Sequence, residues 1–112
     1  MTCSRHDVVL LPIPFADLTS RKVRPAIVIG HGGFPGDLFV VPVTSKLENA
    51  HFPLTGWQEA GLNVPSGVKS QIATVEDRLV RKVVGRLDTA DAATLDRSLR
   101  EWLQIEPGSV QV

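Results

Sequence analysis

The chain of 112 residues has little of several residue types that build metal or disulfide sites. Because Cys3 is the single cysteine, the chain can form neither a disulfide framework nor a zinc cluster of thiolates. The three histidines, at positions 6, 31 and 51, lack the close helical spacing of a metalloprotease-type site. We therefore expect no metal or other cofactor, and a reducing compartment.

Long hydrophobic runs are missing as well. The longest run, Val8 to Ala16, contains Pro12 and Pro14 and is too short to span a bilayer. No apolar segment of the kind found in secretory signals accompanies the short polar stretch Met1 to Asp7. These features predict a soluble, cytoplasmic protein that does not use a membrane as partner.

The chain also has no net charge, since twelve Lys and Arg balance twelve Asp and Glu. This excludes a uniformly basic protein that coats nucleic acid. The charges are unevenly placed: residues 1–86 hold ten basic and seven acidic side chains, whereas residues 87–112 hold two and five. Two basic groups stand out, and both can be solvated surface, the interpretation we favour for the second. They are Arg21, Lys22 and Arg24, and then Arg78, Arg81, Lys82 and Arg86.

What the sequence does contain is a series of short strand-like segments. Prolines at positions 12, 14 and 42 place edges or bulges in the segments that hold them. A turn-rich segment over 31–37 predicts a hairpin. The expected strands are 8–15, 26–30, 38–44, 50–54, 68–75 and 81–87.

One helix is expected after the strands. Asp88 or Thr89 can cap it, and Asp91 places negative charge in its first turn. Pro107 and Gly108 stop it. Its apolar stripe is Ala92, Leu95, Leu99, Trp102 and Leu103. Together these elements predict a single, mainly β domain over 1–112: a small, bent barrel with a C-terminal amphipathic helix.

Of four further side chains, two, Phe34 and Trp57, have two interpretations each. Phe34 and Trp57 can stack on unpaired bases, although a tryptophan in a turn more often covers a core. Trp102 is expected to pack in the helix stripe. Cys3 is expected in a frayed terminus, with no sequence evidence of reactivity.

The most informative pair is Arg24 and Thr44. If 25–31 and 38–44 form an antiparallel hairpin centred near residue 34, Arg24 lies just before the first strand and opposite Thr44, the last residue of the second. A guanidinium beside the hydroxyls of Thr44 and Ser45 suits phosphate oxygens. Spacing alone leaves an alternative open, in which Arg24 pairs with Asp17 on the surface and Thr44 only ends a strand.

Four segments, in order, resemble the MazF/PemK (Kid) family of toxin–antitoxin ribonucleases over nearly the whole chain. They are DVVLLPIPFADL at 7–18, KVRPAIVIG at 22–30, VVPVTS at 40–45 and PSGVKSQIATVEDRLVRKVVGRL at 65–87. The resemblance implies an SH3-like (CcdB-like) barrel that forms a homodimer. It also implies cleavage of single-stranded RNA without a metal, by attack of the RNA's own 2′-hydroxyl, and a cognate antitoxin that blocks the groove.

The resemblance also implies roles for individual residues. Arg24 corresponds to the catalytic arginine, and Thr44 to the threonine that stabilises the transition state. The RNA-binding candidates are Ser20, Arg21, Lys22, Ser45, Lys69, Ser70 and Gln71.

The sequence departs from the family pattern at two places. Ser70 precedes Gln71 where many members have an acidic residue, and Ser20, Arg21 and Lys22 replace a Glu-Gln-Gly stretch. Both changes remove carboxylates that could act as bases, so reduced activity is expected. His6 is a candidate replacement base, with a surface histidine of no catalytic role as the alternative.

Two other functions remain open on the sequence. One is a non-catalytic toxin that binds DNA gyrase, as the related CcdB toxins do, although these are not expected to share the Arg-Pro and Thr-Ser motifs. The other is a non-enzymatic β-barrel interaction module.

Overall fold

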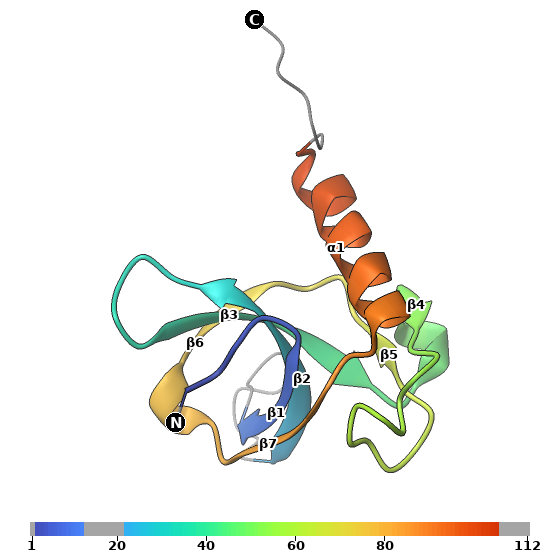
Figure 1. Cartoon of the computed structure of the whole chain (residues 1–112), viewed down its shortest axis with the longest axis horizontal. Coiled ribbons are helices and arrows are strands. Elements are labelled where there is room, and N and C mark those ends of the chain that lie inside the picture. Colours follow the sequence, from blue (N-terminus) through green and yellow to red (C-terminus); the bar gives the residue numbers. More distant parts are fainter. Residues whose placement is uncertain (1, 13–21, 106–112) are drawn as a thin grey trace, which may run out of the picture.

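The computed structural model describes residues 2–12 and 22–105, and these hold seven strands and one α-helix. The strands are β1 (Asp7–Pro12), β2 (Val23–His31), β3 (Asp37–Thr44), β4 (Phe52–Pro53), β5 (Gly67–Val68), β6 (Ala73–Glu76) and β7 (Lys82–Arg86). Two 3-10 helices span Leu47–Asn49 and Asp77–Leu79, and α1 spans Thr89–Leu103 (Figure 1). The expected mainly β fold with a C-terminal helix is confirmed.

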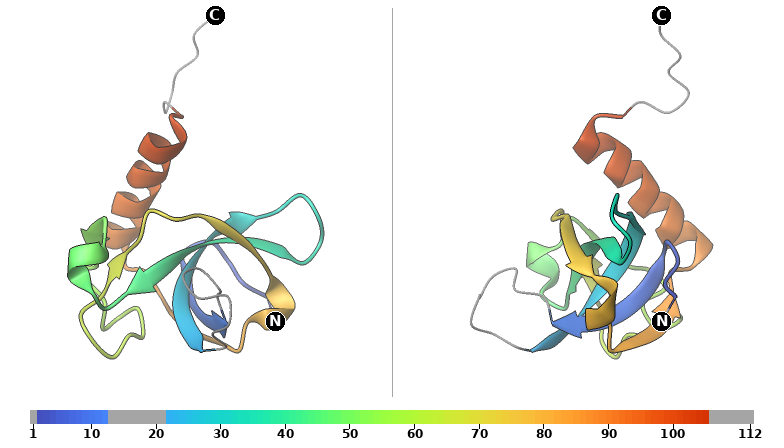
Figure 2. Two further views of the ribbon diagram at one scale, coloured as in Figure 1. Left: turned by 180° about the vertical axis from the view of Figure 1, so that it is seen from behind. Right: turned by 90° about the vertical axis from the view of Figure 1, so that its left-hand side faces the viewer.

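The strands pair antiparallel in the order β4-β5-β3-β2-β1-β7, and β6 also pairs with β3. They curve into a barrel-like body, and α1 rises from one side of it (Figures 1 and 2). None of the helices in residues 2–12 and 22–105 is both long and apolar enough to cross a membrane.

Successive residues of the central strands point to opposite faces, and each face has its own core. The first core contains Val9, Leu11 and Val28 from β1 and β2. The second core lies under α1, where Leu95 is fully buried. Burial on both faces explains why the sequences of β1 to β3 are nearly continuous apolar runs without polar alternation.

Helix α1 begins as the sequence predicts. The Asp88 carboxylate caps it by accepting a hydrogen bond of 2.7 Å from the backbone N–H of Asp91. Trp57 and Trp102 both pack on the second core, as expected. Leu103, however, is 53% exposed, because α1 ends there and Gln104 turns into a left-handed conformation.

The prolines do not mark edge strands, although β1 does contain a bulge, between Val8 and Val9. β1 lies between β2 and β7, and Pro12 is its last residue, where a missing N–H does least harm. β3 also has a neighbouring strand on each side, and Pro42 is the residue at which the hydrogen-bonded pairing of β3 with β2 ends. Residues 13–15 of the expected first strand lie outside the described residues.

The segment expected as one strand over 68–75 is interrupted. Thr44 pairs with Gly67, Val43 with Val68, and the Lys69 N–H donates to the Pro42 carbonyl at 3.0 Å. Pairing with β3 resumes at Val40 and Ala73. Three residues, 70–72, therefore lie opposite Val41 alone and form a bulge between β5 and β6. The expected strand over 50–54 likewise shortens to β4.

The N-terminal segment is packed into the fold, which corrects two expectations. Cys3 is only 4% exposed and belongs to the first core, so it is not in a frayed terminus. His6 has a positive φ of 78°, and its Nε2 lies 2.9 Å from the Asp96 carboxylate of α1. His6 therefore ties the start of β1 to the helix.

The Cys3 thiol is predicted to react slowly. Burial raises its pKa above the ordinary value, and the negative charge of Asp7 raises it further, so less thiolate exists at a given pH. Since one unit of pKa changes the thiolate population about tenfold, we expect iodoacetamide at pH 8 to label the folded protein at least about tenfold more slowly than the urea-unfolded one. Equal rates would place Cys3 outside the core.

Candidate functional site

Of the residues predicted to act on RNA, those that the structure describes lie at the start of β2, at the end of β3 and after β5, and we call this group the strand-end site. Arg24 is the second residue of β2 and lies opposite Leu11 of β1. Its side chain is exposed and makes no ion pair within residues 2–12 and 22–105. Pro25 keeps Arg24 extended, so its guanidinium projects from a rigid strand.

Thr44 is the last residue of β3 and is half-buried. Its Oγ1 accepts a hydrogen bond of 3.0 Å from the backbone N–H of Lys46, a local turn that fixes the hydroxyl at the strand end. A hydroxyl that accepts one hydrogen bond still has its own hydrogen to donate. Thr44 can therefore serve as an oriented donor, and exposed Ser45 follows it directly.

The expected register between β2 and β3 is correct, but the ladder is shorter than expected. Ala26 pairs with Pro42 and Val28 with Val40, and extending this register by two residues makes Arg24 level with Thr44. The ladder stops at Pro42, because from there β3 pairs with β5 while β2 stays with β1. The strand ends then separate (Figures 1 and 2). Arg24 and Thr44 thus flank the end of the ladder and do not face each other as a pair.

Four other predicted residues border this end. Lys69 is half-buried opposite Pro42, so strand alternation places it on the same side of β3 as Thr44. Ser70 and Gln71 are exposed in the bulge after it. Lys22 is exposed just before β2. Ser20 and Arg21 lie outside the described residues.

The family of the chain follows from comparison with known proteins. The model of the PemK-like, MazF-like toxins of type II toxin–antitoxin systems matches residues 4–103. The chain belongs to this family. The match includes the strand-end site and all seven strands. A search of curated proteins finds no match.

In this PemK/MazF-like chain, His6 is remote from the strand-end site. It precedes β1, whereas Arg24 lies opposite Leu11 at the other end of the strand, five residues or about 17 Å along it. Its ring is also engaged by Asp96. His6 is therefore not placed to act as a base there, and it is not a free surface histidine either.

Two other expectations concern ligands. Phe34 is 78% exposed at the tip of the β2–β3 hairpin, beyond the opposite end of β2 from Arg24. Its stacking on bases stays a prediction. Over the described ranges, 2–12 and 22–105, no three His, Cys, Asp or Glu side chains group in a way that could hold a metal ion.

Sequence reasoning assigned two cations at this end of the sheet, Arg81 and Lys82, to solvated surface and did not connect them with the site. Lys82 pairs with Leu10 of β1, and the Arg81 N–H donates to the Leu10 carbonyl at 2.8 Å. Pro25 of β2 lies on the other side of Leu10. Only the strand order brings β7 to the strand-end site, so spacing in the sequence could not reveal it.

Proposed function

We propose that this PemK/MazF-like toxin is a metal-independent endoribonuclease that cleaves single-stranded mRNA at a specific sequence. Two observations support the proposal. One is the family match over residues 4–103. The other is the placement of Arg24 and Thr44 at the same end of neighbouring strands.

The proposed reaction uses the RNA's own nucleophile. The 2′-hydroxyl loses its proton to water as its oxygen attacks the adjacent phosphorus, the bond to the 5′-oxygen of the next nucleotide breaks, and that leaving oxygen takes up a proton from water. The products are a 2′,3′-cyclic phosphate and a 5′-hydroxyl. The enzyme must align these atoms and stabilise the charge on the pentavalent phosphorus.

Arg24 and Thr44 suit the second of these tasks. A guanidinium presents paired donors that match phosphate oxygens, and the Thr44 hydroxyl can donate to the same group. Ser45, Lys69, Ser70 and Gln71, together with Ser20, Arg21 and Lys22, would shape the groove around the RNA. Arginine is a poor base because it stays protonated, so Arg24 is assigned charge stabilisation.

The missing family carboxylates predict a slow enzyme. Ser70 and Gln71 occupy the exposed bulge where many members place an acidic residue. Since general acid–base assistance contributes about 10²–10⁴-fold, cleavage without it would be reduced but not abolished.

Two protein partners belong to the proposal. As a toxin of a toxin–antitoxin pair, the chain would be neutralised by a cognate antitoxin that covers the strand-end site, and it would act as a homodimer. An mRNA substrate would place its action in the cytoplasm.

The test treats a long unstructured RNA with the pure protein in EDTA and maps the fragment ends. We expect cuts at a recurring short sequence, with 5′-hydroxyl and cyclic phosphate ends. Intact RNA would overturn the proposal. If growth arrest and inhibited gyrase supercoiling accompany intact RNA, the protein acts as a CcdB-like toxin instead, and if neither occurs it is a binding module.

A further inference from the structure

The second basic group, expected to be solvated surface, is divided in two by the fold. Arg78 pairs with Glu76 at 2.7 Å, and Arg86 pairs with Asp7 at 2.8 Å. Arg81 and Lys82 are exposed and make no ion pair within the part of the chain that the structure describes. Only these two remain available to a ligand.

The available pair lies at the same end of the sheet as Arg24. Arg81 and Lys82 contact Leu10 of β1, and the next residue, Leu11, pairs with Arg24 of β2. One strand separates the two sets of cations, which corresponds to about 10 Å from β7 to β2. Arg24 of β2 and the pair Arg81 and Lys82 thus lie at the same end of the sheet, on either side of β1.

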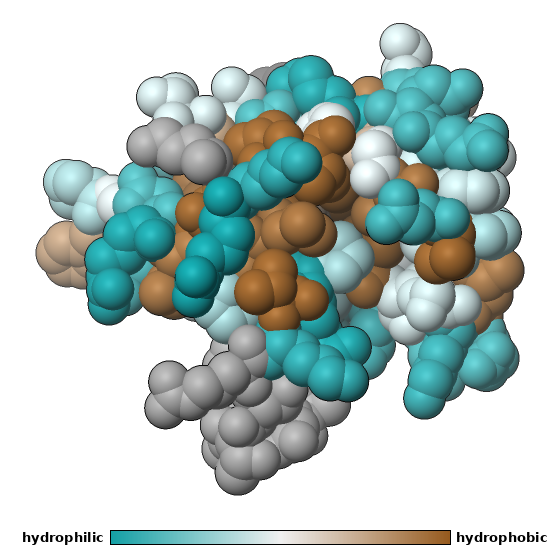
Figure 3. Space-filling model, turned by 90° about the horizontal axis from the view of Figure 1, so that it is seen from below, coloured by the Kyte–Doolittle hydropathy of each residue, from teal (hydrophilic) through white to brown (hydrophobic). Residues whose placement is uncertain are grey.

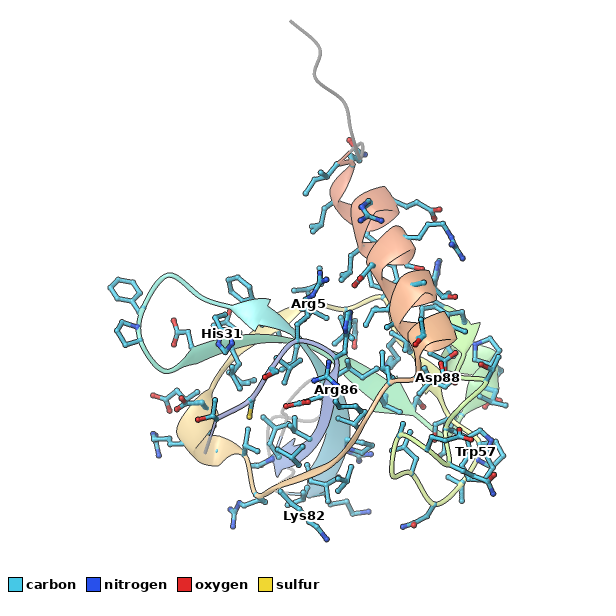
Figure 4. The ribbon with its side chains drawn as sticks, in the orientation of Figure 1. Arg5, His31, Trp57, Lys82, Arg86 and Asp88 are labelled. Carbon is cyan, nitrogen blue, oxygen red and sulfur yellow. The ribbon has the colours of Figure 1, made fainter. Side chains whose placement is uncertain are left out.

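Among the described residues, the acidic side chains of β1 and of the helix start lie at the other end of the sheet. Asp7, the one acidic residue of β1, is at the far end of the strand and is paired with Arg86. Helix α1 begins at that far end, since Leu87 and Asp88 follow Arg86 directly. Lys82 projects from the edge of the body opposite α1 (Figure 4). On the face seen from below, hydrophilic side chains surround a hydrophobic group (Figure 3).

We propose that Arg81 and Lys82 bind phosphates of the RNA beyond the one that is cleaved, so that the strand continues from Arg24 over the end of β1 to β7. The inference rests on the proposed endoribonuclease function. Exposed cations without acidic partners attract a polyanion regardless of its sequence, because they displace its condensed counterions. The pair would therefore supply affinity for long RNA and leave the choice of cleavage sequence to the strand-end site.

The test compares two double variants of equal charge change. Arg81→Ser with Lys82→Ser removes the pair, whereas Arg97→Ser with Arg100→Ser removes two exposed cations of α1. Fluorescence anisotropy measures binding to a mixed-sequence oligonucleotide with 2′-O-methyl riboses, which 2′-hydroxyl attack cannot cleave. We expect the first variant to bind about tenfold more weakly, with the slope of log affinity against log salt reduced by about 1.4, or 0.7 per phosphate contact.

Cleavage kinetics complete the test. KM for a long RNA should rise in the first variant while kcat stays unchanged, and circular dichroism should show the same fold. The inference would be overturned if the two double variants bound the oligonucleotide with equal affinity, whether that affinity is the same as in the wild type or lower. If the wild type binds RNA through the pair but leaves RNA intact, the proposed enzymatic function fails while the phosphate site stands.

Discussion

Replacing Arg24 by alanine is expected to slow RNA cleavage by about 10²–10³-fold, the usual effect of removing one donor that stabilises transition-state charge. Stability should not change, because Arg24 is exposed and makes no ion pair with the described residues 2–12 and 22–105. Single-turnover cleavage of a short RNA containing the mapped site measures the rate, and urea unfolding measures the stability.

Two controls separate geometry from charge. Arg24→Lys keeps the positive charge but loses the planar fork, and we expect it to recover only a small part of the rate. Arg100→Ala removes an exposed cation of α1 and should cleave like the wild type. Wild-type cleavage by Arg24→Ala would exclude Arg24 from the reaction.

The fold could be predicted largely from local patterns. The capping residue Asp88 and the apolar stripe of α1 depend on neighbours within a few residues, and both were predicted correctly except for Leu103, which is exposed. The β2–β3 register was also correct, because a short hairpin leaves few alternatives. The proline argument was right only in part. β1 and β3 are internal strands and not edges, but β1 contains the expected bulge, between Val8 and Val9, and Pro42 ends the ladder between β2 and β3.

The candidate site was predicted only in part, because its geometry depends on contacts between distant segments. Neither the separation of Arg24 from Thr44 nor the bulge at 70–72 can be read from spacing, since both arise where β3 changes partner from β2 to β5. The same is true of His6, whose engagement by Asp96 spans ninety positions of the chain. Cys3 was misplaced for a related reason, because the burial of a terminal segment depends on what packs over it.

The zero net charge illustrates the same limit. It excludes a uniformly basic protein, yet the fold collects Arg24, Arg81 and Lys82 at one end of the sheet. The acidic residues between positions 87 and 103 lie in α1 or directly before it, and α1 begins near the other end of β1. Charge that cancels in the composition can therefore be separated in space, and the separated field can steer an RNA strand.

Asp91 shows how a side chain predicted for one role can have a larger one. It was expected to contribute first-turn negative charge to α1, but it is only 2% exposed. One carboxylate oxygen accepts hydrogen bonds from the N–H and hydroxyl of Thr55 at 3.0 and 2.9 Å, and the other accepts from the Gly56 N–H at 2.8 Å. Asp91 thus binds the loop that precedes Trp57 to the start of the helix.

The loop also packs tightly against the start of α1. A Cβ atom at Gly56 would lie 2.1 Å from the Asp88 Oδ2, so a larger residue there would displace the carboxylate that caps the helix. Trp57 follows immediately and packs on the second core. Loosening the loop would therefore uncover part of that core as well.

Asp91→Ala is expected to lower the free energy of unfolding by about 3 kcal/mol, because it removes three hydrogen bonds to a buried carboxylate and leaves the buried Gly56 N–H without its partner. Asp91→Asn keeps one accepting oxygen and should cost about half as much. Glu101→Ala, which removes an exposed carboxylate from the same helix, should change stability little. Urea unfolding followed by tryptophan fluorescence measures all three. A loss of less than about 1 kcal/mol in Asp91→Ala, within the range of a single ordinary hydrogen bond, would show that the loop is held by its apolar packing and not by the carboxylate.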